Sequence, residues 1–412
     1  MGLAEIPMAQ IGDNESLPEE LTRSQHVADK IASRVAPSVF GDTTAINVSY
    51  IARGAYNHVW LVESSSQATL QPARPAKFVL RICQDNVTSL QPFQSRNHVG
   101  CLQWLALNAP EVPIPKLYDW GDGSSSSPGA SFTAEEFIEG QRLSAVWPTL
   151  AEEQKSSICN QIAKVIVDLG ETRFDAIGSL VPTANGTGVG KSVQYGPTVE
   201  AAKLFNGRAK FHSPEHYNIG PYQDSKSYVL ACYDREMYFY SHADREDIED
   251  FFDTEQDPSD FVESLKRKRR EIVDCDTAAT HDEPVFRVID AEPKVLVHED
   301  FHAGNMLVRD GKLVGVLDWD FAGAYPLSQL LGKGQILQIS MPYEERTDET
   351  EMEEDEWHER YRAAVAEEVR SRSWSQNNID TLLGEGHEML NVARMIMFPE
   401  TQGSDAESMS EE

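Results

Sequence analysis

The spacing of apolar residues divides the chain into a strand-rich first part and a helix-rich second part. Period-2 alternation and β-branched runs bounded by Gly, Pro and Ser predict short strands before residue 140. The expected strands cover 45–51, 59–62, 77–83 and 131–138. Helical spacing is expected at 17–35 and 93–109 in the first part, and it dominates afterwards, at 151–169, 224–274 and on to about 398.

Strands followed by helices are typical of an α+β protein in which a β-rich lobe joins a helical one. The chain has 412 residues, a length that fits two or three compact units or one large bilobal domain. We expect four segments, which are an N-terminal helical extension (1–40), a β-rich N-lobe (41–139), a helical C-lobe (140–398) and an acidic disordered tail (399–412).

The densest group of polar residues lies around a predicted hairpin. Asp310 and Gly311 stand between two alternating apolar runs, which is the strongest short-range hairpin signal. A hairpin at this turn pairs Arg309 with Lys312. It brings the side chains of Asn305 and Asp318 together at its open end. Asp300 lies on the loop just before it.

Three oxygen-bearing side chains in one small volume suit phosphoryl transfer. Mg²⁺ prefers carboxylate and amide oxygens and keeps phosphate oxygens as further ligands. A separate carboxylate must orient the attacking hydroxyl and accept its proton. The pattern H-x-D-x-x-x-x-N, followed by a hairpin and another Asp, is the kinase catalytic-loop arrangement. The sequence has it at His298–Asn305 and Asp318.

These segments resemble the aminoglycoside phosphotransferase family of the protein-kinase-like fold. His298–Val308 and Leu317–Asp320 match its H-G-D-L-H-x-x-N-I-L-V and I-D-W-E/D signatures. Weaker marks occur in the expected order over residues 45–330. They are the nucleotide loop at Gly54–Asn57, the third strand at Val79–Ile82, the V-P-V-P-like Val112–Pro115 and the hinge at Glu135–Gly140.

The resemblance implies an ATP- and Mg²⁺-dependent enzyme that moves the γ-phosphate to a hydroxyl of a small molecule. By position, Asp300 would be the catalytic base, Asn305 and Asp318 would bind the metal, and His298 would buttress the catalytic loop. His302 would support the loop or approach a phosphate, and Asp320 would be a nearby charge. The residues implied in ATP binding are Gly54, Asn57, Val79, Arg81, Glu136, Phe137 and Ile138.

One position departs from the family pattern. His98 stands where the helix after the third strand usually carries a Glu that pairs with the residue at Arg81. Three explanations remain open: the alignment is shifted, another acid substitutes, or phosphate positioning is impaired. The third would make the chain a nucleotide-binding pseudokinase or scaffold with weak or no transfer activity.

A zinc hydrolase is a further alternative, because His298 and His302 are four residues apart and could ligate a metal on a helix. The Asp-Gly hairpin and the β run that precedes it argue against a helix at this place. A protein kinase is less consistent with the sequence, since D-W-D replaces D-F-G and no A-P-E follows.

Composition restricts the partners. The formal net charge of −31 repels phosphate backbones, so we expect no nucleic-acid partner, and it tolerates a cationic acceptor. Five scattered cysteines without a C-x-x-C motif fit reduced thiols in a cytoplasmic protein. No stretch has the ~18 apolar residues of a membrane span, and the first residues do not read as a secretory signal.

Two basic or glycine-rich motifs are expected to have no function. Gly186–Ser192 resembles a phosphate-binding P-loop but has Asn185 where the spacing requires glycine. Lys266–Arg270 could be a nuclear signal or an anion patch, yet its helical context with neighbouring Glu residues favours a solvated helix face. The acidic run Glu351–Glu356 is likewise expected on the surface.

Overall fold

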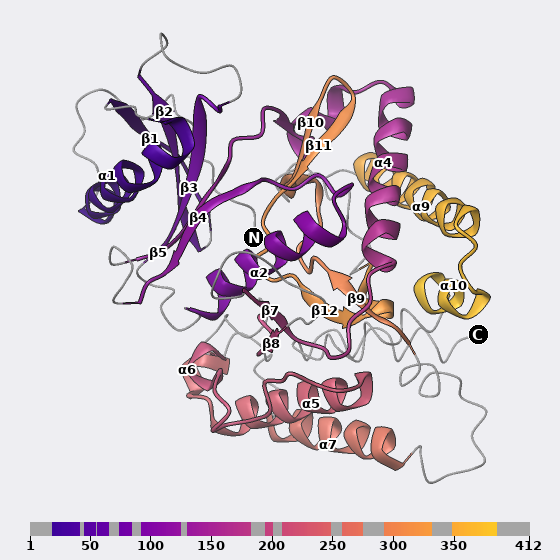
Figure 1. Cartoon of the computed structure of the whole chain (residues 1–412). Coiled ribbons are helices and arrows are strands. Elements are labelled where there is room, and N and C mark those ends of the chain that lie inside the picture. Colours follow the sequence, from indigo (N-terminus) through magenta and orange to yellow (C-terminus); the bar gives the residue numbers. More distant parts are fainter. Residues whose placement is uncertain are drawn as a thin grey trace.

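A computed structural model of the chain shows two packed parts, a β-sheet with covering helices and a larger, mainly helical part (Figure 1). The structure describes residues 19–41, 45–54, 56–65, 74–84, 92–124, 130–182, 194–200, 208–248, 258–274, 292–331 and 348–384. Several predicted segments lie outside the described residues. They are Gly186–Ser192, Cys275, residues 385–398 of the expected C-lobe and the tail 399–412.

The first part is built on a five-stranded antiparallel sheet with the strand order β1-β2-β3-β5-β4. Its strands are β1 (Ile46–Arg53), β2 (Asn57–Ser64), β3 (Lys77–Cys83), β4 (Leu117–Asp122) and β5 (Ser131–Glu136). In β3, the predicted alternation is confirmed. Phe78, Leu80 and Ile82 are buried on one face, whereas Lys77, Val79 and Arg81 share the other.

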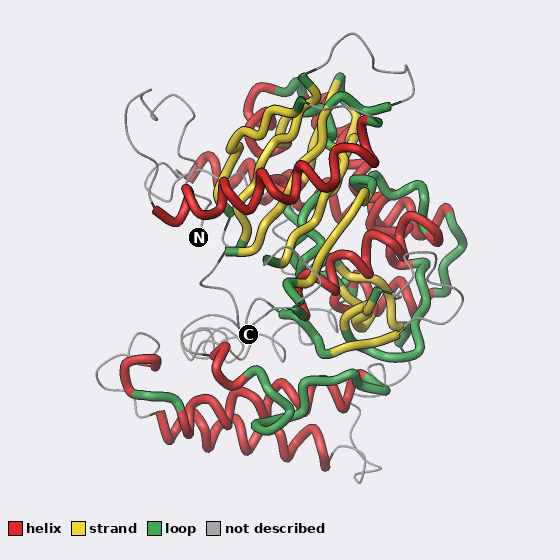
Figure 2. Tube along the Cα trace, turned by 60° about the vertical axis from the view of Figure 1, so that its left-hand side comes forward, coloured by secondary structure: helices red, strands yellow, loops and turns green. Residues whose placement is uncertain are grey.

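Helix α1 (Glu19–Phe40) covers the face of the sheet that carries the apolar residues of β3 (Figure 2). Its buried stripe includes Ala28, Ile31 and Val35, which repeat at helical spacing and pack with Trp60 and Phe78 of the strands. Strand alternation and helix amphipathicity therefore meet in one small core, so α1 is a structural part of the sheet layer.

Helix α2 (Phe93–Asn108) lies on the opposite side and joins the sheet to the helical part. Its Gly100 passes so close to β7 (Ser179–Val181) that a Cβ there would stand 2.0 Å from the Leu180 carbonyl oxygen. The Asn97 amide oxygen also accepts a hydrogen bond from the Leu180 N–H at 2.9 Å. These contacts hold α2 firmly against the larger part of the molecule.

The larger part is organised by helix pairs around one extended hydrophobic core. α4 packs on α9, and α5 on α7, as the side-by-side ribbons of Figure 1 show. The helices are α3 (Leu143–Val146), α4 (Glu152–Gly170), α5 (Ser225–His242), α6 (Arg245–Ile248), α7 (Pro258–Asp274), α9 (Asp348–Ser371) and α10 (Gln376–Leu383).

Short β-ribbons lie between the sheet and these helices. The strands are β6 (Gln141–Arg142), β7, β8 (Gln194–Gly196), β9 (Lys294–Val297), β10 (Met306–Arg309), β11 (Lys312–Val316) and β12 (Gly323–Pro326). β10 pairs with both β11 and β6, and β9 pairs with β12. Pairing of β6 with β10 brings the end of the hinge segment beside the predicted hairpin.

The predicted strands and helices are confirmed where the structure describes them, with small shifts at their ends. The long helical pattern at 224–274 is divided into α5, α6 and α7. The strands β4, β6, β7, β8 and β12 were not predicted. The lobe boundaries at residues 40, 139 and 398 stay predictions. Among the described residues, no helix is long and apolar enough to cross a membrane, and none of the four described cysteines forms a disulfide.

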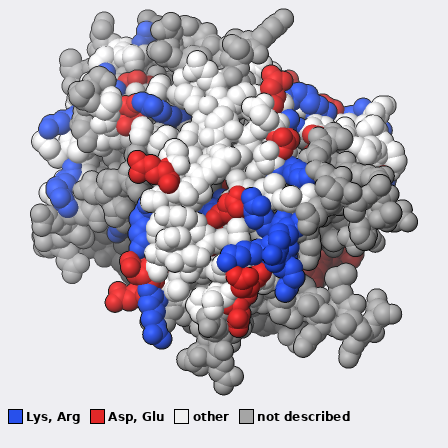
Figure 3. All heavy atoms as spheres, turned by 90° about the horizontal axis from the view of Figure 1, so that it is seen from below, with Lys and Arg blue, Asp and Glu red and all other residues white. Residues whose placement is uncertain are grey.

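The basic run in α7 lies on a solvated helix face, as predicted. Lys266 pairs with Glu263 at 2.7 Å and Arg269 with Asp234 at 2.6 Å. In the view of Figure 3, Lys and Arg side chains lie beside Asp and Glu side chains. Residues 352–356 of the acidic run are also mostly exposed along α9.

Shortening Ile31 to Ala is expected to lower the free energy of unfolding by about 2–5 kcal/mol, because a fully buried Ile in a packed core leaves a cavity. Urea denaturation followed by tryptophan fluorescence measures the change. Lys30→Ala on the exposed face of the same helix is the control and should change it by less than about 0.5 kcal/mol. Equal effects of the two substitutions would show that α1 contributes nothing to the core.

Candidate active site

The predicted hairpin is present and places its polar residues as expected. Arg309 pairs with Lys312, and Asp310 and Gly311 at the tip have φ angles of +52° and +71°. Asx and Gly residues adopt this left-handed conformation most readily, which is why they form such turns. At the open end, the Leu317 N–H donates to the Asn305 carbonyl oxygen at 2.8 Å. Asn305 and the neighbouring Asp318 therefore emerge together.

Asp300 lies on the loop between β9 and this hairpin, and Asn305 holds it. The Asn305 Nδ2 donates to the Asp300 carbonyl oxygen at 3.0 Å and to its Oδ2 at 2.9 Å. The His302 Nε2 lies 3.6 Å from the Asp300 Oδ1. Burial opposes ionisation of Asp300, but His302, His298 and Asn305 outweigh it and lower its pKa. Asp300 is an oriented carboxylate that can accept a proton.

His298 is buried beneath this loop and both of its ring nitrogens are engaged. The Nε2 lies 2.9 Å from the Leu317 carbonyl oxygen, and the Nδ1 accepts the Asp300 N–H at 3.3 Å. Burial lowers its pKa to about 4, so the ring is neutral. The His298 ring also packs on the ring of the fully buried Trp319, with the ring centres 4.5 Å apart. His298 thus ties the Asp300 loop to the end of the hairpin.

Asp318 follows β11 with a φ of +64°, a conformation that non-glycine residues rarely adopt. Its Oδ1 accepts from Arg81 Nη2 at 2.8 Å. Burial raises the pKa of Asp318 to about 6 against the influence of Arg81, with Asp320 and Asp300 adding to the rise. Burial raises the pKa of Tyr56 as well, and the carboxylates of Asp300, Asp318 and Asp320 add to that rise.

Asp320 is the most highly connected carboxylate of the site and corrects the expectation of a mere nearby charge. It is buried, and its Oδ1 lies 3.0 Å from Arg81 Nη2 and 2.9 Å from His98 Nδ1. Its Oδ2 accepts from the Asn57 amide at 3.0 Å and the Gln94 amide at 3.1 Å. These donors lower its pKa although burial alone would raise it. Asp320 joins β2, β3 and α2.

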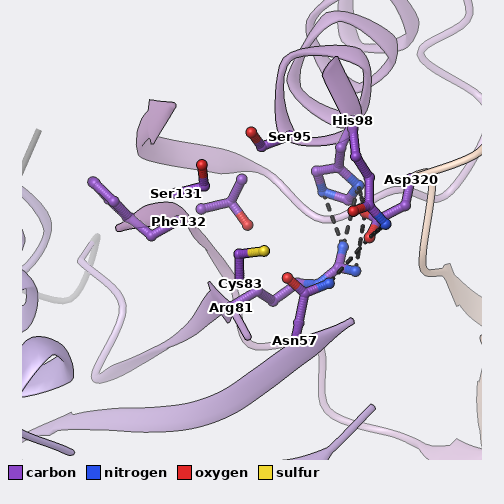
Figure 4. A pocket seen from close by; sticks show the side chains of 10 residues that line it. Asn57, Arg81, Cys83, Ser95, His98, Ser131, Phe132 and Asp320 are labelled. Carbon is purple, nitrogen blue, oxygen red and sulfur yellow. Dashed lines mark hydrogen bonds and ion pairs between the residues drawn. The ribbon is translucent and has the colours of Figure 1, made fainter. Parts of the chain in front are cut away.

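His98 lies opposite Arg81, where the family resemblance placed it. The Arg81 Nη1 approaches its two ring nitrogens at 3.1 and 3.2 Å, and the His98 Nε2 lies 2.9 Å from Glu135 Oε1. A pocket of about 20 Å³ beside Arg81 and His98 is also lined by Ser131 and Asp320, as Figure 4 shows. That volume holds roughly one water molecule.

The expected nucleotide-loop residues lie at the turn between β1 and β2. The Gly54 N–H donates to the Asn57 carbonyl oxygen at 2.8 Å, and the Gly54 carbonyl accepts from Gln84 Nε2 at 2.6 Å. Ala55 lies outside the described residues. The Asn57 side chain donates to Asp320. Its amide therefore contacts the buried charge group, which comprises Arg81, His98, Glu135 and Asp320.

The expected adenine-binding segment follows β5. The Glu136 N–H donates to the Lys116 carbonyl oxygen at 2.8 Å and is therefore already engaged. The Lys77 ammonium lies 4.1 Å from the centre of the Phe137 ring. Ile138 packs on Gly315 of β11, where an added Cβ would lie 2.9 Å from the Ile138 Cδ1. Val79 lies across from Glu135 on β3, with its side chain half-buried.

Glu135 is the residue of this site that sequence reasoning missed. It is buried on β5 and also accepts from the Thr133 hydroxyl. The alternation of Thr133 and Glu135 within an expected strand places both on one face, but only the pairing of β5 with β3 shows that this face lies against Arg81. An acid inside a predicted strand was the available signal.

Comparison with solved structures finds aminoglycoside phosphotransferases. One from Ralstonia eutropha is 14% identical, with 90% of this chain and 97% of that chain covered and a TM-score of 0.42. The streptomycin–ATP complex of APH(2″)-IIa is 12% identical, with 93% and 99% covered and a TM-score of 0.42.

Curated relatives match over a short region. A subtelomeric hrmA-associated cluster protein of Aspergillus fumigatus is 23% identical over 137 residues, 33% of this chain and 25% of the relative. The altered inheritance of mitochondria protein 9 of Kluyveromyces lactis is 26% identical over 146 residues, 33% of this chain and 22% of the relative. The match thus spans about a quarter of the length of each.

The family comparison covers most of the chain. Residues 47–367 match the model of the phosphotransferase enzyme family, APH, and include the β-sheet, the Asp300 loop and the hairpin. The predicted α+β fold of the protein-kinase-like type, with a β-rich N-lobe and a mainly helical C-lobe, is confirmed. The chain belongs to the APH phosphotransferase enzyme family.

Proposed function

We propose that the chain transfers the γ-phosphate of ATP, with Mg²⁺, to a hydroxyl group of a small molecule. The observation that carries the proposal is the grouping of Asp300, Asn305 and Asp318 at the open end of the β10–β11 hairpin, next to Arg81. Phosphoryl transfer requires positioning and charge stabilisation more than covalent chemistry by the protein. The site offers both.

Asp300 is proposed as the catalytic base. Its carboxylate is ionised and fixed by Asn305, so it can orient the acceptor hydroxyl and take its proton as the phosphoryl group is transferred. His298 is proposed as a supporting residue, because both of its ring nitrogens are engaged in holding the loop. The same engagement argues against zinc ligation by His298 and hence against a zinc hydrolase.

The donor set suits Mg²⁺. The Asn305 amide N–H groups point to Asp300, which leaves its amide oxygen as a hard ligand, and Asp318 adds a carboxylate. Two protein ligands are the usual number at such sites, where phosphate oxygens and water complete the shell. Asn305 and Asp318 would hold the ion, which when bound would neutralise charge on the phosphates.

ATP would bind against the sheet. Arg81 would contact its phosphates, Val79 would line the adenine, and Gly54 and Asn57 would form the loop over the phosphates. Since the Glu136 N–H is engaged by Lys116, contacts with the adenine edge would fall to Phe137 and Ile138. The net charge of −31 favours a cationic acceptor over a nucleic acid. A cytoplasmic location stays a prediction.

A nucleotide-binding pseudokinase is the second candidate, and His98 in place of the expected Glu is the observation that favours it. A screen of hydroxyl-bearing metabolites with γ-labelled ATP separates the two. Transfer of label to an acceptor supports the enzyme. Nucleotide binding without transfer to any acceptor or to water supports the pseudokinase.

Asp318→Asn is expected to lower kcat/KM by about 10²–10³-fold, because the carboxylate that would hold Mg²⁺ at the phosphates is lost. It should also raise the Mg²⁺ concentration needed for half-maximal rate. Asn tolerates the left-handed backbone of this position, so the loop should keep its shape. Steady-state rates at several Mg²⁺ concentrations measure both effects.

Asp310→Asn at the exposed hairpin tip is the matched control, since it makes the same substitution at a similar φ angle. It should leave the Mg²⁺ dependence unchanged. An Asp318→Asn enzyme with the same Mg²⁺ dependence as the unmodified chain would remove Asp318 from the metal site.

A further inference from the structure

His98 is held between two carboxylates from different elements. Its Nε2 lies 2.9 Å from Glu135 Oε1 on β5, and its Nδ1 lies 2.9 Å from Asp320 Oδ1, which follows the hairpin. All three side chains are buried, with 1%, 5% and 4% of each residue exposed. An ionised carboxylate can only accept hydrogen bonds, so both ring nitrogens must carry a proton. The two carboxylates therefore describe an imidazolium. Such a ring cannot accept a hydrogen bond from the Arg81 Nη1, which lies 3.1 and 3.2 Å from its two nitrogens, so the guanidinium lies against the ring without a hydrogen bond to it.

Charge balance supports the same state. Arg81 and His98 together supply two positive charges, Glu135 and Asp320 supply two negative ones, and Asp318 adds a third negative charge where it pairs with Arg81. A neutral imidazole would leave one buried carboxylate without compensation, which is costly. Burial opposes charge on His98, but Glu135 and Asp320 raise its pKa to about 9 in spite of Arg81. Burial also opposes charge on Glu135, yet His98, Arg81 and Thr133 lower its pKa to about 2.

A Glu at position 98 would not fit this surrounding. Three buried carboxylates would then converge on one guanidinium that already binds Asp318, and two of the three would lie within hydrogen-bond distance of each other. The His at 98 and the Glu at 135 are therefore compatible only as a pair. The carboxylate that the family pattern expects on α2 is instead found on β5, 3.9 Å from Arg81 Nη1.

We propose that Glu135 and His98 are positioning residues for phosphoryl transfer, which together replace the missing α2 carboxylate and hold Arg81 in place for the ATP phosphates. This inference rests on the proposed function. His98 links Glu135 to Asp320, and Asp320 in turn receives the Arg81 Nη2 at 3.0 Å. The guanidinium is thereby fixed between β3, α2 and the segment after the hairpin. Without Glu135, the Asp318 and Asp320 carboxylates would draw it toward the hairpin.

The test moves the carboxylate between the two elements. Glu135→Gln is expected to weaken MgATP binding roughly 10- to 100-fold, because a charge-assisted hydrogen bond to His98 is lost. His98→Glu should weaken it at least as much through repulsion of three acids. The double variant His98→Glu/Glu135→Gln returns the carboxylate to α2 and should bind MgATP at least about 10-fold more tightly than His98→Glu alone.

Glu153→Gln is the matched control, since it makes the same substitution at an exposed position on α4, away from the proposed ATP-binding residues. It should change MgATP affinity less than about 2-fold. Titration calorimetry measures affinity without an acceptor, and circular dichroism checks that each variant folds. A double variant no better than His98→Glu, or a folded Glu135→Gln chain with unchanged MgATP affinity, would overturn the inference.

A second readout does not depend on nucleotide. In histidine labelled with ¹⁵N, the His98 signals, identified by their loss in His98→Gln, should show protons on both ring nitrogens at neutral pH. Glu135→Gln should return the ring to a neutral form. A neutral His98 in the unmodified chain would overturn the inference by itself. If instead the His98 signals are as expected but the unmodified chain binds no MgATP, the proposed function fails and not the geometry.

Discussion

Replacing Asp300 by Asn is expected to lower kcat by about 10²–10⁴-fold, the contribution typical of a general base. Asn has nearly the same shape and can still contact Asn305, but it cannot accept the proton of the acceptor hydroxyl. MgATP affinity should stay within about 2-fold, because Asp300 is not among the proposed ATP-binding residues. Single-turnover transfer of γ-labelled phosphate measures the first effect and titration calorimetry the second.

Asp310→Asn provides the matched control for this experiment too, since it removes a carboxylate from the same hairpin region at an exposed site. It should transfer phosphate at the rate of the unmodified chain. Transfer by Asp300→Asn at an undiminished rate would show that another group is the base. Absence of transfer from the unmodified chain, with MgATP bound, would identify a pseudokinase.

Replacing Asp320 by Ala is expected to lower the free energy of unfolding by about 3–5 kcal/mol, the range for removing one partner of a buried ion pair. The substitution leaves Arg81 and His98 buried without one of their carboxylates, and it removes the acceptor of two amides. Asp320→Asn should lose less, because it keeps part of the hydrogen bonding. Urea denaturation measures both.

Asp119→Ala is the control, because Asp119 forms an ion pair with Arg34 at 2.8 Å in which 38% and 43% of the two side chains are exposed. Such a surface pair contributes about 0–1 kcal/mol. If Asp320→Ala cost no more than Asp119→Ala, the buried charge group would not hold the sheet to α2.

The hairpin and the β3 strand were predictable because their signals are local. Asp310-Gly311 is a turn that two residues specify, and it places Lys312 opposite Arg309. The register shift between Leu307 and Val308, which pairs Met306 with Val316, is not specified by the turn. The alternation in Lys77–Cys83 likewise requires no knowledge of distant segments, since the period of two alone separates Phe78 from Arg81.

The buried charge group was not predictable, because its members come together through long-range pairing. Glu135 reaches His98 only because β5 pairs with β3 as well as with β4, the strand that precedes it in the sequence. Asp320 collects donors from positions more than two hundred residues earlier, such as Asn57 and Gln94. The short strand β12 was missed for a similar reason, since Gly323–Pro326 contains Gly and Pro and is a strand only beside β9.

The attachment of α2 has a consequence for how the sheet and the larger part can move relative to each other. Its Asn97 amide nitrogen donates to the carbonyls of Asp320 and Ala322 at 3.0 and 2.6 Å, and its amide oxygen accepts from Leu180 at 2.9 Å. With Gly100 pressed on the same strand, α2 cannot swing outward by itself. The helix therefore belongs with the larger half, and Asp320 ties β2 and β3 to the same helix. Any motion that separates these strands from α2 would have to break the ion pairs of Asp320.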